Sequence, residues 1–265
     1  MRSSKTDTHL RLRVFAGPNG SGKSTVIQYV RDQKVNGRPI DFGIYINADD
    51  IARSLREGEF SFDNYEIQVS ANEFVEIVLE SGLIGREFDE TAFKKSYTLK
   101  DNNLKLRDKK VDERLAQIIA DFLRKKLLLE KKKFSFETVF SHPSKLDIMK
   151  QAANMGYKVY LYFVSTESPH INTFRVLARK TKGGHDVPKD KIISRYYRSL
   201  ELLFEASQIA YQAYYFDNSE EGTDFKMFAH FKRVDKKMKW DKRKKKNDPI
   251  WFKKHYSMRK ANDTE

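Results

Sequence analysis

A nine-residue stretch near the N-terminus constrains the fold of this 265-residue chain more than any other feature. It fits the pattern G-x-x-x-x-G-K-[ST] at every fixed position and has the sequence Gly17-Pro18-Asn19-Gly20-Ser21-Gly22-Lys23-Ser24-Thr25. The residues before it, 10–16, alternate apolar and basic side chains and predict a strand. The residues after it carry Val26, Ile27 and Val30 at helical spacing. A glycine-rich loop between a strand and a helix predicts an α/β fold.

The chemistry expected of this loop follows from its position at the start of a helix. The backbone N–H groups of residues 19–24 should converge on one point, where free donors and the helix dipole favour a di- or triphosphate. Lys23 would reach the β- and γ-phosphates, and the Ser24 hydroxyl would coordinate Mg²⁺. The loop therefore predicts a site for ATP or GTP with Mg²⁺. The alternative is a glycine-rich turn before an ordinary helix.

The charge of the chain is concentrated near its C-terminus. The net charge is +14, and residues 226–265 hold 15 Lys and Arg against 5 Asp and Glu, which leaves +10 for this segment and +4 for residues 1–225. The sequence has no cysteine, no apolar run long enough to cross a bilayer, and no apolar stretch behind Met1 that resembles a signal peptide. We therefore expect a cytoplasmic protein with no membrane partner. It would consist of a domain at 1–225 and a basic extension at 226–265.

Apolar segments of strand length alternate with helical patterns along the rest of the chain. We expect strands at 43–47, 134–138, 157–164 and 214–216. The strand at 214–216 would be the last of the sheet. One helix should open at Ser168-Pro169, and the others are expected at 65–82, 111–131, 144–155 and 189–212. Residues 83–110 show no clear period and predict an irregular insertion. The alternation predicts a doubly wound, mostly parallel sheet.

Acidic residues that follow predicted strands suit the transfer of a phosphate to a hydroxyl. Asp49 comes just after the strand at 43–47, at the sheet edge where open α/β sheets bind ligands, and is the favoured base. Asp50 is the less favoured neighbour, and both carboxylates could instead cap the following helix. Glu137 and the adjacent Thr138 would bind the acceptor substrate, although a solvated strand end would also explain them.

Arginines flank a loop that contains Gly183 and Gly184. Arg179 precedes this loop and Arg195 follows it, each in a helical pattern. In phosphoryl transfer such a lid closes over the triphosphate and supplies positive charge, so both arginines join Lys23 as candidate catalytic residues. The alternative is that they belong to solvated helix faces. Other candidates in this region stay open: Arg175, His185 and Arg198.

The segment 236–246 interleaves Trp240 with many cations. Such a segment could bind RNA or an acidic partner through its charge. A solvated, partly disordered end is the more ordinary explanation, so a nucleic-acid partner is an alternative and not the favoured prediction.

Together these motifs resemble the zeta toxin family of P-loop small-molecule kinases over roughly residues 11–220. The segments that carry the resemblance are, in order, GPNGSGKST, INADDIA, FETVFSH, GYKVYLYFV, RVLARKTKGGHDVPKDKIISRYYRSLE and FDNS. The resemblance implies the P-loop kinase fold, with Asp49 as base, Glu137 as the family's glutamate, and Arg179 and Arg195 as lid arginines. It also implies ATP- or GTP-dependent phosphorylation of a small metabolite. The best known acceptor is the 3′-hydroxyl of UDP-N-acetylglucosamine, and a small helical antitoxin is the usual partner.

Two departures from the family keep other functions open. The insertion at 83–110 lies where family members shape the acceptor pocket, and the basic extension is not a general family feature. A polynucleotide or RNA kinase is the main alternative. A transporter-type ATPase, whose nucleotide loop is similar, ranks last because the chain has no LSGGQ-like segment and no apolar strand ending in Asp-Glu.

Overall fold

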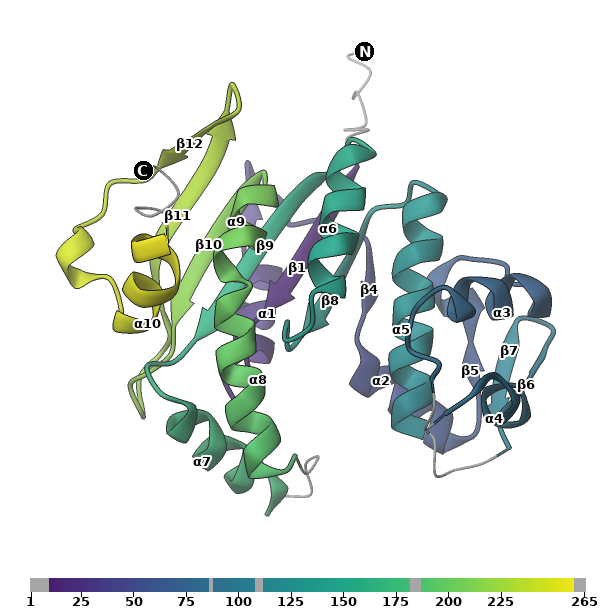
Figure 1. The fold of residues 1–265 in the computed structure, drawn as a ribbon. Coiled ribbons are helices and arrows are strands. Elements are labelled where there is room, and N and C mark those ends of the chain that lie inside the picture. The colour runs from purple at the N-terminus through teal and green to yellow at the C-terminus, as the bar shows by residue number, and fades with distance from the viewer. Residues whose placement is uncertain (1–9, 86–87, 108–111, 182–186, 260–265) are drawn as a thin grey trace, which may run out of the picture. The chain divides into compact units, whose positions relative to one another are not determined.

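The computed structural model describes residues 10–85, 88–107, 112–181 and 187–259 (Figure 1). The chain forms two compact units, of which one comprises Met1–Phe42 and Glu137–Glu265 and the other Gly43–Phe136. No helix within the described ranges is both long enough and apolar enough to cross a membrane.

The central sheet has seven strands, which are β1 Arg11–Ala16, β4 Ile44–Ile46, β8 Phe134–Thr138, β9 Lys158–Ser165, β10 Gln212–Asp217, β11 Lys226–Val234 and β12 Lys237–Trp240. Their order is β12-β11-β10-β9-β1-β8-β4. β1, β9 and β10 run parallel to one another, as β4 does to β8, whereas β11 and β12 are antiparallel additions. The predicted α/β class with a mostly parallel sheet is therefore confirmed.

Helices cover both faces of the sheet in the first unit. They are α1 Lys23–Asp32, α6 Ser144–Asn154, α7 Pro169–Lys180, α8 Lys189–Glu201 and α9 Leu203–Ile209. Figure 1 shows α6, α8 and α9 on one face and α1 on the other. In β9 every residue from Leu161 to Ser165 is buried, as helices on both faces require, whereas at the start of the strand Lys158 and Tyr160 are only half-buried.

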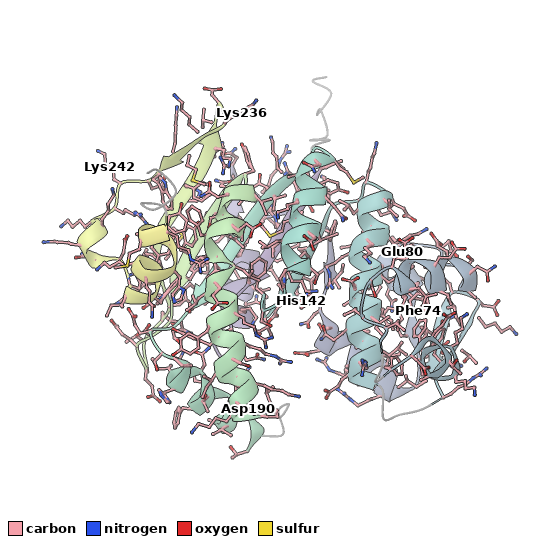
Figure 2. The ribbon with its side chains drawn as sticks, in the orientation of Figure 1. Phe74, Glu80, His142, Asp190, Lys236 and Lys242 are labelled. Atoms are coloured by element: carbon pink, nitrogen blue, oxygen red, sulfur yellow. The ribbon has the colours of Figure 1, made fainter. Side chains whose placement is uncertain are left out.

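The second unit is built around an aromatic core. Its further elements are α2 Ala48–Glu57, β5 Phe60–Ser61, α3 Ala71–Leu79, α4 Glu90–Lys95, β6 Tyr97–Lys100, β7 Asn103–Leu106 and α5 Asp112–Leu129. The ring of Phe74, labelled in Figure 2, lies at centroid distances of 4.9 to 5.8 Å from Phe62, Phe93, Tyr97 and Phe122. Edge-on and tilted ring pairs of this kind add to the stabilisation from buried area.

Residues 83–110 are not an irregular insertion, because their described part holds α4 and an antiparallel hairpin of β6 and β7. The hairpin turns at Asp101 and Asn102, which have φ of 49° and 62°. Two left-handed residues form the turn whose twist matches the flanking strands. Asn102 also accepts a hydrogen bond from the N–H of Val69 at 3.0 Å and donates one to the carbonyl of Ile67 at 2.7 Å. The sequence of this segment shows no helical period because much of it forms short strands.

Two predicted helices are shorter than expected. α3 begins only after Ser70, whose hydroxyl accepts a hydrogen bond from the N–H of Glu73 at 3.2 Å and so caps the helix. The pattern at 189–212 divides into α8 and α9 at Leu202. A further hairpin pairs β2 Lys34–Val35 with β3 Arg38–Pro39.

The basic extension is folded over its described part, residues 226–259, and is not a disordered end. β11 and β12 continue the sheet, with Lys236 at the turn between them, so the predicted strand at 214–216 is not the last (Figure 2). Three short elements follow: a 3₁₀ turn at Lys245–Asn247, α10 Ile250–Phe252 and a π-helical turn at Lys253–Ser257. Fully buried Tyr215 of β10 packs against Phe252 and Tyr256 at centroid distances of 4.9 and 5.9 Å. Burial of these rings outweighs the solvation of the lysines around them.

Candidate functional site

The loop between β1 and α1 has a backbone that only glycine can adopt at its tightest points. Gly17 and Gly20 have φ of 148° and 75°. A Cβ atom on Gly17 would lie 2.1 Å from the carbonyl oxygen of Val164, and one on Gly20 would lie 2.5 Å from that of Asn172. The glycines are therefore required both by the backbone angles and by close approach to β9 and α7.

The first turn of α1 is open to a ligand. α1 begins at Lys23 behind Gly22, and no side chain caps it. The N–H groups in the first turn of a helix have no partners within the helix, and the side chains of Ser24 and Thr25 are exposed at this turn. Free donors together with the positive end of the helix dipole favour an anion at this position.

Lys23 and Glu137 meet beneath the loop, as the sequence analysis predicts for a single site. The ammonium of Lys23 donates a hydrogen bond to the carbonyl of Pro18 at 3.1 Å and lies 3.7 Å from the carboxylate of Glu137. The two side chains are only 8% and 17% exposed. A buried ammonium group is stabilised by anionic partners, and a phosphate could act as one beside Glu137.

A second layer of asparagines holds the loop from below. Asn172 of α7 donates a hydrogen bond to the carbonyl of Asn19 at 2.5 Å and is also bonded to Thr166. Asn218, just after β10, donates to the carbonyl of Ser21 at 2.9 Å. Sequence reasoning missed Asn172, and it included Asn218 only as part of the FDNS segment. The available signal for Asn172 was a polar residue on the apolar face of its helix.

Two polar atoms of the loop are buried and have no hydrogen-bond partner among the described residues: Asn19 Oδ1 and Ser21 Oγ. A buried hydroxyl without a partner costs free energy unless a ligand or water satisfies it. The Ser21 hydroxyl can donate to a phosphate oxygen, so the residues present fit a nucleotide phosphate.

In the second unit, Asp49 and Asp50 occupy the first turn of α2, and their surroundings differ. The cap is Asn47, whose Oδ1 accepts the N–H of Asp49 at 2.9 Å, so neither carboxylate fills that role. Asp50 is ion-paired with Arg53 at 2.7 Å. Asp49 is exposed and has no ion pair within the described parts of the chain. These contacts leave Asp49 as the more accessible of the two carboxylates.

The candidate arginines lie on α7 and α8, whose contact is sealed by Val176, Val187 and Ile192. Arg179 is exposed and Arg195 is half-buried. Burial, reinforced by the nearby charge of Arg198, lowers the pKa of Arg195. Arg175 instead donates to the carbonyl of Asn218 at 2.7 Å, which ties α7 to the layer beneath the loop. The loop residues 182–186, including His185, lie outside the described residues.

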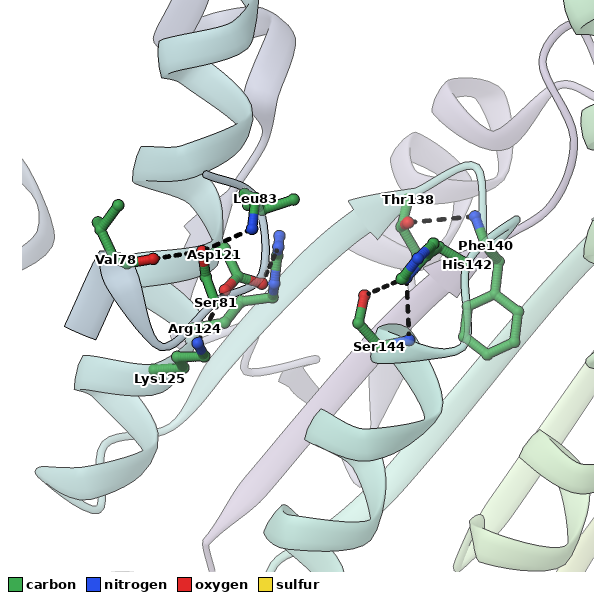
Figure 3. A network of polar contacts seen from close by, with 10 residues as sticks. All are labelled: Val78, Ser81, Leu83, Asp121, Arg124, Lys125, Thr138, Phe140, His142 and Ser144. Atoms are coloured by element: carbon green, nitrogen blue, oxygen red, sulfur yellow. Dashed lines mark hydrogen bonds and ion pairs between the residues drawn. The ribbon is translucent and has the colours of Figure 1, made fainter. Parts of the chain in front are cut away.

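The turn after β8 positions the residues next to Glu137 (Figure 3). The Thr138 hydroxyl accepts a hydrogen bond from the N–H of Phe140 at 3.1 Å, and Phe140 has a left-handed φ of 59°. His142 Nδ1 accepts the N–H of Ser144 at 3.2 Å and lies 2.9 Å from its hydroxyl, so this pair starts α6. Thr138 thus shapes the turn, and its role toward a substrate stays a prediction.

Within the described ranges, no group of three or more His, Asp or Glu side chains lies close enough together to hold a metal ion. Mg²⁺ in phosphoryl-transfer sites commonly keeps several waters and takes only one or two protein oxygens besides the phosphates. The exposed hydroxyl of Ser24 at the open turn of α1 fits that pattern.

Comparison with known proteins finds similarity in structure only. No protein-family profile and no curated protein match the sequence. A chain from the PezAT chromosomal toxin-antitoxin system of the human pathogen Streptococcus pneumoniae aligns at 16% identity over 82% of this chain and 72% of that one, with a TM-score of 0.45. A chain of the AvrRxo1-ORF1:AvrRxo1-ORF2 complex with sulphate ions aligns at 14% identity over 84% of this chain, with a TM-score of 0.48. This protein spans 58% of the length of that AvrRxo1 chain. At such low similarity the function must be argued from the site itself.

Proposed function

We propose that the protein is a P-loop phosphotransferase that moves the terminal phosphate of ATP or GTP to a hydroxyl of a small metabolite. The observation that carries this proposal is the position of Lys23, which lies inside a glycine loop at an uncapped helix start, 3.7 Å from the carboxylate of Glu137. Buried hydrogen-bond donors and unpaired N–H groups of a helix start surround this lysine, and such groups bind phosphate. A lysine with a purely structural role would not require them.

The proposed chemistry assigns one task to each group. The acceptor hydroxyl oxygen forms a bond to the γ-phosphorus, the bond from this phosphorus to the bridging oxygen breaks, and the nucleoside diphosphate leaves. Asp49 takes the proton of the hydroxyl, while Lys23 and Arg195 stabilise the charge that develops on the phosphate. Mg²⁺, held by Ser24 and the phosphates, would supply further charge neutralisation.

The acceptor and the biological role are proposed from the family resemblance. A zeta-type toxin would phosphorylate a UDP-N-acetyl-amino-sugar in the cytoplasm and be neutralised by an antitoxin. The test is to incubate the protein with ATP, Mg²⁺ and a panel of nucleotide sugars, and to search by mass spectrometry for products heavier by one phosphate. No product across the panel would rule out the UDP-sugar acceptor. ATP consumption with no phosphorylated product in a metabolite extract would rule out transfer to a metabolite.

Asp49 and Asp50 offer a matched pair of variants for this reaction. We expect Asp49→Asn to lower kcat by about 10²- to 10⁴-fold with ATP affinity unchanged, because only the proton acceptor is lost. Asp50→Asn should keep most of the activity, because it removes an exposed ion pair worth at most about 1 kcal/mol. Steady-state kinetics and nucleotide titration check both. Equal losses in the two variants would show that Asp49 is not the base.

Lys23→Ala should abolish nucleotide binding itself.

A polynucleotide kinase remains the second candidate because cations cluster on β11 and β12. Deletion of 236–246 would be a poor test, since Lys237–Trp240 is a strand of the sheet. End-phosphorylation of an RNA oligonucleotide by the intact chain is the direct test. Its absence, alongside transfer to a metabolite, would decide against this candidate.

A further inference from the structure

One face of the central sheet holds cations and tyrosines near the starting ends of its parallel strands. Strand register aligns Tyr160 of β9 with Gln212 of β10, then with Lys232 of β11 and Lys239 of β12. All of them are half-buried or exposed. The basic face is defined here as Lys158, Tyr160, Tyr211, Gln212, Lys232 and Lys239.

Positive charges on the basic face are brought close together without compensation. Lys232 and Lys239 are directly opposite in an antiparallel pair, an arrangement that destabilises a sheet when the charges are alike. The ammonium groups of Lys158 and Lys232 both lie over the ring of Tyr211, at 5.3 and 6.0 Å from its centroid. None of these lysines is ion-paired within the described part of the chain. A bound polyanion would relieve the repulsion.

Two acids border this face, and neither is ion-paired with its lysines within the described residues. Asp241 Oδ2 lies 2.9 Å from Nδ1 of His230, which is charged only when protonated, and Asp41 lies 3.8 Å from Arg11.

Aromatic rings alternate with the cations. The guanidinium of Arg13 lies 4.5 Å from the ring centroid of Tyr160, and the rings of Tyr160 and Tyr211 are 5.8 Å apart. Gln212 lies between Tyr160 and Lys232 in the register. Its amide nitrogen lies 2.9 Å from Nε2 of His230, so its carbonyl oxygen is the group that can accept a hydrogen bond from a ligand. Rings for bases, cations for phosphates and an amide for base edges are the elements that bind single-stranded nucleic acid on a sheet.

We propose that the basic face binds a single-stranded nucleic acid. A lipid surface fits less well, because the face presents no aliphatic side chain that could enter a bilayer. Two observations carry this proposal: the register that places Lys232 opposite Lys239, and the contacts of Tyr211 with Tyr160, Lys158 and Lys232. It does not depend on the proposed phosphotransfer.

The basic face is separate from the phosphate loop. Gly17 contacts β9 at Val164, near its end, whereas Lys158 is at its start. With a rise of about 3.3 Å per residue, these positions are roughly 20 Å apart. A strand of nucleic acid on this face would be a bound partner and not the acceptor of the phosphate.

The first test measures fluorescence anisotropy of a labelled twelve-nucleotide oligouridine with the full chain. The double variant Lys232→Glu/Lys239→Glu should bind at least about tenfold more weakly. The slope of log affinity against log salt should fall by about 1.4, because each phosphate that a lysine no longer neutralises lowers it by about 0.7. The control Lys244→Glu/Lys245→Glu changes the net charge equally at exposed residues outside the sheet, and we expect less than a threefold effect. Equal losses in the two variants would overturn the proposal, because they would indicate attraction by net charge alone.

The second test separates ring stacking from charge. Tyr211→Leu should weaken binding by about tenfold with an unchanged salt slope, whereas Tyr29→Leu, an exposed tyrosine of α1, should have no effect. Thermal unfolding confirms that each variant is folded. Unchanged affinity in a folded Tyr211→Leu variant, equal competition by duplex DNA, or binding to anionic vesicles without binding to the oligonucleotide would each contradict the proposal.

Discussion

Gly20 and Asn172 show how single residues connect the fold to the chemistry of the loop. Gly20 lets the loop backbone approach the carbonyl of Asn172, and the Asn172 side chain then holds the carbonyl of Asn19. The carbonyls of Asn19 and Ser21 are thus held by side-chain amides, while the N–H groups in the first turn of α1 stay available for an anion. One missing Cβ atom and one amide thus determine the geometry on which phosphate binding depends.

This close approach can be tested by adding the Cβ atom. We expect Gly20→Ala to lower ATP affinity by at least about tenfold and the free energy of unfolding by about 1–3 kcal/mol, because the backbone is left-handed and the new atom meets a carbonyl. Gly222→Ala is the control, since Gly222 has a similar φ of 71° but nothing within 4 Å of the added Cβ. Isothermal titration and urea unfolding measure both quantities. Full ATP affinity in Gly20→Ala would show that the close approach is dispensable.

Hairpins with two-residue turns organise the regions where no helical period exists. Asp101-Asn102 joins β6 to β7, and Asp235-Lys236, with φ of 50° and 63°, joins β11 to β12. Such turns keep the twist of the strands but require residues that tolerate a left-handed backbone. Lysine is poorly suited to that conformation, so the second hairpin stores local strain.

Relief of this strain should be measurable. We expect Lys236→Gly to raise the free energy of unfolding by about 0.5 kcal/mol, because glycine adopts the left-handed region without a Cβ clash. Lys237→Gly, at the adjacent strand position, should lower it by about 0.5–1 kcal/mol. Urea unfolding followed by circular dichroism gives both values. A loss of stability in Lys236→Gly as large as in Lys237→Gly would contradict the turn assignment.

Across the whole molecule, the C-terminal residues are joined to the phosphate loop. The carboxylate of Glu167 accepts the N–H groups of Ile250 and Trp251 at 2.8 and 3.2 Å. The indole N–H of Trp251 donates to Asp217 at 2.8 Å, next to Asn218, which in turn bonds to the loop. The last described elements therefore support the same strand ends as the site.

Truncation tests whether the basic extension is a separate part, as the boundary at residue 225 predicts. We expect a chain of residues 1–225 to be insoluble or largely unfolded, because it loses β11, β12 and the rings that bury Tyr215. A chain ending at residue 259 keeps every described element and is the matched control. Circular dichroism and thermal unfolding compare the two. A cooperatively folded 1–225 fragment with full ATP affinity would confirm the predicted boundary.

Several elements could be predicted from local signals along the chain. β1, the phosphate loop and α1 follow from a fixed glycine pattern between a strand and a helix. β8 and β9 follow from apolar runs of strand length, so Lys23 and Glu137 could be expected at one edge of the sheet. Local spacing is sufficient in these cases because the geometry of strand, turn and helix is set by neighbouring residues.

Contacts between residues far apart in the chain could not be predicted in this way and are known from the folded structure. Asn172 and Asn218 support the loop from positions more than 150 residues away in the chain. The extension folds because its rings pack on Tyr215, an interaction that its lysine-rich composition conceals. The basic face exists because register aligns Tyr160, Gln212, Lys232 and Lys239 across four strands. These pairings depend on burial and strand register across the whole chain, and a local pattern contains no information about either.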